Sequence, residues 1–493
     1  MTIDIRKHLV PLELLDINEC KTISDTVAQM ENCAIGARMI GEAARMIANW
    51  IESGKDPMVI YDDPDPKEVG FNLAAENFAK NLQNVEHGHW ALTAEEYASR
   101  GFKNPIIVFG HYPRRWHDYL CERGEDGAIF INNFGVAPSW VKDGYFKGFV
   151  NADPHLILPI LHCCLQERIH KTCFSFSSLM QFWQKSGGVG HQVAHGFETF
   201  RQMIEDPEYT VMSGMSGIMT MAKMGGLISH MIDQKWVQAV ASTGALMGHG
   251  LVEGIGLKHY KYDPQFSDDE YGKQRLNRIT DTLEPEENLT AAEMIIHKIL
   301  KRVPSGKVLS PVEINQLIGK HLNRYYKSGS SILRSAYRTG TPVFVPAFWD
   351  SELGNDIETE CQRRVVRKLE RIYVCPGIDN QLLINIVTGA KKLGVFILGG
   401  GTPRNYLMNS APLIDIINER LGENYYPRVR YIKGTRICPD SMFLGHLSGC
   451  TWNENMTWGK TDTVHGRFSE VMADATMIYP FYMAAMKEVI ESR

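Results

Sequence analysis

The second half of the chain alternates short apolar runs with helical stretches, and this alternation constrains the fold more than any other feature. Apolar runs of strand length lie at residues 236–242, 342–348, 371–375 and 395–398, with helical stretches at 246–253, 380–393 and 482–491. Strands separated by helices are typical of parallel sheets covered on both faces. We therefore predict an α/β fold with a doubly wound, mostly parallel, Rossmann-like sheet flanked by helices.

The amino-terminal part has an α/β pattern of its own. Residues 23–52 carry apolar side chains at three- and four-residue steps, which predicts one long amphipathic helix or a helix pair. Apolar runs at 105–109 and 128–131 predict short buried strands. We expect an additional amino-terminal α/β region over residues 1–165 and a catalytic region over 166–493. Within the latter, residues 177–204 predict a second helical stretch, and the polar segment 260–311 predicts a surface excursion.

Composition and charge exclude several classes of protein. The chain is 44% hydrophobic and 22% charged, which is ordinary for a globular protein, and its net charge of −5 leaves no basic surplus for a nucleic-acid backbone. The most apolar stretch, residues 212–232, is interrupted by Lys223 and several glycines. We expect no nucleic-acid partner, no membrane partner and, since the amino end does not resemble a signal peptide, a cytoplasmic protein.

The cysteines and histidines give no signature of a metal site. The chain has 10 cysteines but no CxxC pair, so reduced thiols are expected. The closest histidine groupings are His87 with His89 and His111 with His117, and neither has a third ligand at helical spacing. We therefore predict no metal.

The strongest local motif is an apolar strand that ends in three glycines. Gly399, Gly400 and Gly401 lack Cβ atoms, so a ligand can touch the backbone and its N–H groups can face a phosphate. This favours a nucleotide or phosphate ligand. A plain tight turn explains the glycines equally well, and both interpretations stay open.

Four acidic residues follow another predicted strand. Asp350, Glu352, Asp356 and Glu358 lie where open α/β sheets bind ligands, and such a group favours a cationic ligand such as a polyamine. The alternative is a helix amino terminus with acids placed against the helix dipole.

A third motif combines an acid, an aromatic ring and a lysine within residues 447–460. Burial beside Trp458 would lower the pKa of Lys460 and make its neutral amine available for a Schiff base. The ring face of Trp458 would also hold an ammonium group. By chemistry alone, a solvent-exposed Lys460 after a glycine turn is the commoner arrangement.

Several motifs together make the chain resemble deoxyhypusine synthases, most closely the bacterial deoxyhypusine synthase-like branch. The resemblance covers about residues 170–493. It rests on VPAFWDSELG at 345–354, GGGTPR at 399–404, Asp440-Ser441 followed by Leu447-Ser448-Gly449, TWGK at 457–460 and MADA at 472–475.

The resemblance implies an NAD-dependent transfer without net redox change. In the family a 4-aminobutyl group moves from spermidine through a lysine imine to an acceptor amine. Lys460 matches the imine-forming lysine, and Glu454 and Trp458 match residues that hold the amine. The positions that would contact NAD are Ser242, Thr243, Asp350, Gly399, Gly400, Gly401, Ser448, Asp474 and Ala475. A homotetramer is also implied.

The chain departs from the family pattern at its amine site. Asn405 stands where the family has a spermidine-binding histidine, and Asn355, next to Asp356, stands where it has an amine-binding aspartate. A paired-acid stretch reads Gly248-His249-Gly250 here. These changes favour a small diamine acceptor such as putrescine, as in homospermidine formation. A protein lysine of the hypusine-bearing translation factor, a non-catalytic NAD-binding subunit and an ordinary NAD dehydrogenase remain alternatives.

Overall fold

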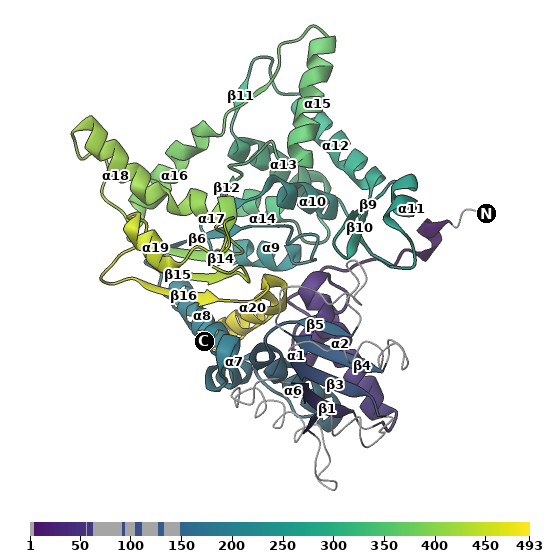
Figure 1. The fold of residues 1–493 in the computed structure, drawn as a ribbon. Helices are drawn as coiled ribbons and strands as arrows, with labels where there is room; N and C mark the ends of the chain where they lie inside the picture. Colours follow the sequence, from purple (N-terminus) through teal and green to yellow (C-terminus); the bar gives the residue numbers. More distant parts are fainter. Residues whose placement is uncertain (1–3, 56, 63–90, 94–103, 111–126, 133–147) are drawn as a thin grey trace.

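Two large parallel sheets, of five and six strands, organise the protein (Figure 1). The computed structural model describes residues 4–55, 57–62, 91–93, 104–110, 127–132 and 148–493. The histidine pairs His87/His89 and His111/His117 lie outside these residues. No helix within the described part is both long and apolar enough to cross a bilayer.

The amino-terminal sheet has five strands in the order β2-β1-β3-β4-β5, and all of its described pairs are parallel. The segment predicted at 23–52 is a helix pair, because the chain leaves the helical conformation after Met30 and re-enters it at Ile35. The elements of this region are η1 (Ile5–His8), α1 (Ile23–Met30), α2 (Ile35–Glu52), β1 (Met58–Asp62), β2 (Ala91–Thr93), β3 (Ile106–Gly110), β4 (Ala128–Asn132), β5 (Phe149–Asn151) and α6 (Pro154–His170). Helix α6 runs through position 165, where we placed the domain boundary.

The main sheet has six strands in the order β12-β7-β6-β14-β15-β16, all paired in parallel. Its strands are β6 (Tyr209–Met215), β7 (Ala239–Ser242), β12 (Val343–Phe344), β14 (Lys392–Leu398), β15 (Tyr431–Ile437) and β16 (Arg467–Val471). When these six strands are numbered by their order along the chain, their order across the sheet is 3-2-1-4-5-6, which is the Rossmann arrangement. The predicted doubly wound α/β fold is confirmed.

Helices cover both faces of this sheet (Figure 1). Phe396 and Leu398 of β14 pack into one apolar cluster with α8 and α20, whereas Val395 and Ile397 pack into another with α17 and α18. Successive side chains of a strand point to opposite faces, so β14 is apolar throughout because both faces are buried. The helices of this region are α7 (Phe176–Lys185), α8 (Gly188–Glu205), α9 (Gly225–Asp233), α10 (Gly244–Gly254), α11 (Asp268–Lys273), α12 (Glu286–Leu300), α13 (Pro311–Tyr325), α14 (Ile332–Thr339), α15 (Glu352–Val366), α16 (Gly377–Gly389), α17 (Gly401–Met408), α18 (Ser410–Leu421), α19 (Trp452–Thr457) and α20 (Ala475–Glu491).

Three sequence-based expectations are corrected. The predicted helix at 177–204 is two helices, α7 and α8, separated at Ser186 and Gly187. The run at 371–375 contributes β13 (Tyr373–Val374), which pairs with β11 (Val308–Leu309) and not with the main sheet. The polar segment 260–311 is not a simple surface excursion. It forms an antiparallel sheet of β8 (Tyr260–Lys261), β9 (Leu276–Ile279) and β10 (Thr282–Pro285), where Leu283 and Glu284 are fully buried.

The two regions share one apolar core. Val59, Ile107 and Val150 of the amino-terminal sheet belong to the same cluster as the residues of α8 and α20. Helix α2 lies beside α20, where the Ala37 backbone N–H donates to Thr476 Oγ1 at 3.1 Å. The amino-terminal region is therefore packed against α20 and shares its apolar core.

Candidate active site

A cavity of 330 Å³ lies at the carboxyl edge of the main sheet. Strand β6 pairs with β7 on one side and β14 on the other, so the strand order reverses between β6 and β14. Open α/β sheets bind ligands in the crevice at such a switch point. Seven of the residues predicted to contact a nucleotide line this cavity together: Ser242, Thr243, Asp350, Gly399, Gly400, Gly401 and Ser448.

The three glycines shape one wall of this cavity. Gly399 and Gly401 have φ angles of +81° and +60°, in the left-handed region that glycine adopts without strain. A Cβ atom on Gly400 would lie only 2.5 Å from the carbonyl oxygen of Ser448. Helix α17 begins at Gly401 with no side-chain cap on its first N–H groups. This uncapped amino end, at a backbone without Cβ atoms, fits the phosphates of a dinucleotide.

A second cavity, of 710 Å³, adjoins the first and shares Gly401 and Thr402 with it. Lys460, Asn405, Glu454 and Trp458 line it. Lys460 is half-buried, and its Nζ donates to Asn405 Oδ1 at 2.7 Å. Burial lowers the pKa of Lys460, and the guanidinium of Arg404 acts in the same direction. Lys460 is therefore not the solvent-exposed lysine of the commoner arrangement.

Local structure explains how these side chains reach the cavity. Thr451 and Glu454 form a capping box at the start of α19, in which Glu454 Oε2 accepts from the Thr451 backbone N–H at 2.9 Å. That hydrogen bond lowers the pKa of the exposed Glu454 carboxyl group. Gly459, with a φ of +67°, turns the chain after α19, and the Tyr431 N–H donates to the Lys460 carbonyl at 3.1 Å. The ring of Trp458 is 69% exposed and lies at the rim.

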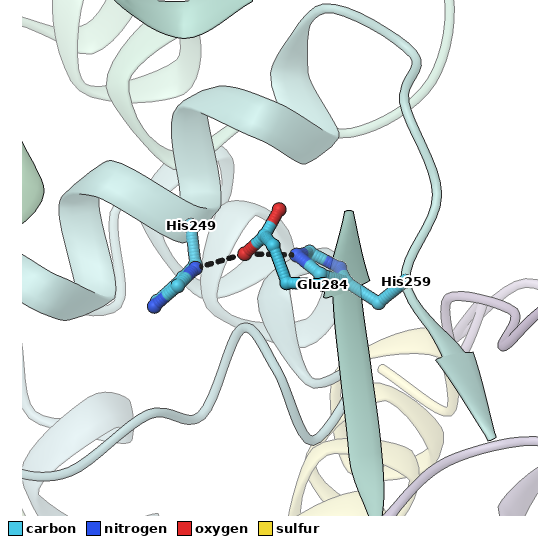
Figure 2. A group of neighbouring side chains, drawn as sticks. All are labelled: His249, His259 and Glu284. Atoms are coloured by element: carbon cyan, nitrogen blue, oxygen red, sulfur yellow. Dashed lines mark hydrogen bonds and ion pairs between the residues drawn. The ribbon is translucent and has the colours of Figure 1, made fainter. Parts of the chain in front are cut away.

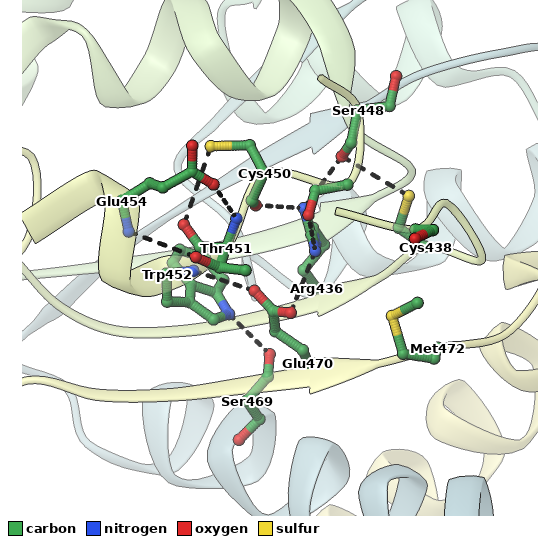
Figure 3. A network of polar contacts seen from close by, with 12 residues as sticks. Arg436, Cys438, Ser448, Cys450, Thr451, Trp452, Glu454, Ser469, Glu470 and Met472 are labelled. Carbon is green, nitrogen blue, oxygen red and sulfur yellow. Dashed lines mark hydrogen bonds and ion pairs between the residues drawn. The ribbon is translucent and has the colours of Figure 1, made fainter. Parts of the chain in front are cut away.

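Two buried arginines, Arg404 and Arg436, hold the loop between the cavities, and Figure 3 shows the contacts of Arg436. Arg436 of β15 donates from Nη1 to the carbonyl oxygens of Ser448 and Cys450 at 3.0 and 2.7 Å, and pairs with Glu470 at 3.2 Å. Arg404 of α17 also donates to the Cys450 carbonyl, at 2.6 Å. Sequence reasoning missed both roles. The available signal was Arg436 itself, a charged residue directly before the apolar residue that ends the strand.

Four predicted site residues lie elsewhere in the described chain. Asn355 and Asp356 belong to α15 and line neither cavity. Burial of Asp356, together with the negative charges of Glu293 and Glu352, raises the pKa of its carboxyl group to about 7. Asp474 caps α20 by accepting from the Thr476 N–H at 2.7 Å, and neither Asp474 nor Ala475 lines either cavity. Their assignment to the amine and NAD sites remains a prediction.

A buried group that sequence reasoning missed lies against α10. His249, His259 and Glu284 converge there from α10, from the loop before β8 and from β10 (Figure 2). The two histidines stand 35 and 25 residues from Glu284, so no local spacing marks them. Their proximity follows from the antiparallel sheet, which the sequence analysis did not predict.

Comparison with known proteins places this chain in a family. Residues 178–486 match the sequence model of "DS: Deoxyhypusine synthase". The chain is 31% identical over 315 residues to "Probable deoxyhypusine synthase 2" of Methanosarcina acetivorans, covering 64% of this chain and 87% of that protein. It is 26% identical over 309 residues to "Deoxyhypusine synthase-like protein" of Elusimicrobium minutum, covering 62% and 79%. A match over more than half of the chain shows that this protein belongs to the deoxyhypusine synthase family.

Proposed function

We propose that this protein is an NAD-dependent transferase that moves a 4-aminobutyl group from spermidine, or a related polyamine, through Lys460 to a small acceptor diamine such as putrescine. The observation that carries the proposal is the position of Lys460. Its amine, with a lowered pKa, faces a 710 Å³ cavity that opens into the crevice at the switch point of the sheet.

The residues of the crevice fit NAD. The uncapped amino end of α17 would face its phosphates, and Asp350, Ser242 and Thr243 line the same space. NAD bound there would accept one hydride from the donor amine and later return it, so the transfer would have no net redox change.

Lys460 then carries out the transfer itself. Its neutral amine adds to the carbon of the oxidised donor, and 1,3-diaminopropane leaves as the carbon–nitrogen bond to it breaks. The acceptor amine displaces Lys460 in the same way and leaves a new imine, for which bound NADH would supply the hydride that makes it a stable secondary amine. Asn405 holds Nζ at 2.7 Å through its amide oxygen and adds no charge. Trp458 and Glu454 at the same cavity supply a ring face and a carboxylate for an ammonium group.

The size of the cavity and the residue at position 405 support a small acceptor. Sites for small molecules commonly enclose about 300–1,000 Å³, and this one measures 710 Å³. Asn405 replaces the histidine of the family pattern, so the site differs from that of enzymes that modify a protein lysine. A protein acceptor is the second candidate, and the products decide between them.

The test is borohydride trapping with spermidine and NAD, followed by mass spectrometry of the protein and its products. The native protein is expected to gain a four-carbon unit on Lys460 and, with putrescine present, to form homospermidine and 1,3-diaminopropane. Lys460→Arg should lose both and keep its NAD affinity within a few-fold. Lys433→Arg is the matched control, because Lys433 also has a pKa lowered by burial and also donates to an amide oxygen, that of Gln202 at 2.6 Å, outside the cavity.

Three results would contradict the proposal. Product formation by Lys460→Arg would remove Lys460 from the reaction. Sustained NADH accumulation would indicate a dehydrogenase. NAD binding without product from any pair of small amines would favour a protein acceptor or a non-catalytic subunit.

We also infer that the protein is a homotetramer. This inference is consistent with the position of Asn355, Asp474 and Ala475, which lie outside both cavities of a single chain. Light scattering of the purified protein would measure the number of subunits.

A further inference from the structure

His249, His259 and Glu284 face one another (Figure 2). None of the three lines either active-site cavity. Their exposed fractions are 5%, 0% and 0%. One nitrogen from each ring and one carboxylate oxygen lie within 4.8 Å of one another. Among the described residues, this is the group of three histidine and acidic side chains whose nitrogen and oxygen atoms lie close enough together to hold one metal ion.

Both imidazole rings point at the same carboxylate oxygen. His249 Nδ1 lies 2.5 Å and His259 Nε2 lies 3.1 Å from Glu284 Oε2. The other carboxylate oxygen, Oε1, accepts from Asn288 Nδ2 at 3.3 Å, which fixes the plane of the carboxylate. Two imidazole nitrogens and one carboxylate oxygen are a ligand set that Zn²⁺ and related divalent ions adopt in proteins.

The surrounding residues supply a second layer of contacts. Lys223 is 2% exposed, and its Nζ lies 2.8 Å from Glu253 Oε1 and 2.6 Å from His259 Nδ1. Glu253 Oε1 lies 3.9 Å from the same ring nitrogen. A histidine that binds a metal through one nitrogen commonly directs the N–H of the other at a carboxylate. Glu253 is in position for that role, with Lys223 retained as its counter-ion.

The same atoms can therefore hold either hydrogens or a cation at their centre. With Lys223 donating to Nδ1, the proton of His259 lies on Nε2 and is directed at Glu284. With a metal on Nε2, that proton moves to Nδ1 and faces Glu253, and Lys223 donates to Glu253 alone. The ion and Lys223 then carry three positive charges, and the two buried carboxylates offset two of them, which lowers the cost of burial.

We propose that His249, His259 and Glu284 bind one divalent transition-metal ion, with the ligand preference of Zn²⁺, in place of the hydrogens that the rings direct at Glu284. The site joins α10 to β10. Because α10 begins at Gly244, in the wall of the 330 Å³ cavity, a bound ion would brace that wall from behind.

The experiment uses Co²⁺ as a probe of the full-length protein after treatment with a chelator. We expect one Co²⁺ per chain with strong visible absorption bands, displaced by one equivalent of Zn²⁺. His249→Asn and Glu284→Gln should each weaken Co²⁺ binding at least about tenfold. His297→Gln is the matched control, because His297 pairs with Glu360 at 2.6 Å without a second imidazole, and it should leave Co²⁺ binding unchanged.

X-ray absorption of the Co²⁺-loaded native protein provides a readout that does not depend on the folding of any variant. Two imidazole ligands to the metal would support the site. None or one would overturn it, as would the absence of stoichiometric Co²⁺ binding or unchanged binding in folded His249→Asn. Those outcomes would identify the group as a hydrogen-bonded ion-pair network.

Discussion

At the scale of single residues, the amide oxygen of Asn405 accepts a hydrogen bond from the amine of Lys460, and the charge at this position can be changed with little change in side-chain size. Asn405→Asp places a carboxylate at 2.7 Å from Nζ and should raise the pKa of Lys460 by about 1 unit or more. Since only the neutral amine forms an imine, the rate of trapping at Lys460 should reach half its maximum at a correspondingly higher pH.

The pH profile of borohydride trapping measures this shift. Asn409→Asp is the matched control, because Asn409 lines the same cavity, whereas the side chain that accepts the hydrogen bond of the Lys460 amine is Asn405. Its profile should move far less. Identical profiles for Asn405→Asp and the native protein would show that the amide of Asn405 does not lie beside the reacting amine.

At the scale of elements, the loop from β14 to α17 packs against the loop that carries Ser448. Gly400→Ala would place a Cβ atom 2.5 Å from the Ser448 carbonyl oxygen, and the backbone would have to move. We expect NAD affinity to fall about tenfold or more and stability to fall by about 1–3 kcal/mol.

Calorimetric titration with NAD and urea denaturation measure these two effects. Gly389→Ala in α16 is the control, since nothing lies within 4 Å of its added Cβ, and it should bind NAD as the native protein does. Native NAD affinity in Gly400→Ala would remove the triple-glycine loop from the nucleotide site.

At the scale of the whole molecule, an ion pair buried between the two regions joins α2 to the turn before β10. Arg38 and Asp281 are 7% and 1% exposed and lie 3.0 Å apart. Asp281→Asn keeps the shape but leaves the guanidinium without its carboxylate, so the free energy of unfolding should fall by about 3 kcal/mol.

Because one apolar core spans both regions, the loss should appear as a shift of a single unfolding transition. Differential scanning calorimetry measures it. Glu52→Gln is the control, because the Glu52–Arg168 pair is exposed and contributes about 0–1 kcal/mol. Two separate transitions in Asp281→Asn would show that the regions unfold independently.

The sequence alone determined the class of fold and the motifs at the carboxyl edge of the main sheet. Strands β7 and β14 and the glycines at 399–401 are local patterns, and local patterns are written in consecutive residues. The resemblance placed Lys460, Trp458 and Glu454 at one site, and the structure brings these three together.

Only the tertiary structure decided which distant residues meet. It set Asn405 beside Lys460, placed Arg436 under the Ser448 loop, and left Asn355 and Asp474 outside both cavities. It also assembled His249, His259 and Glu284 from three elements. Such contacts depend on how helices and sheets pack, and packing is a property of the whole core that no window of sequence contains.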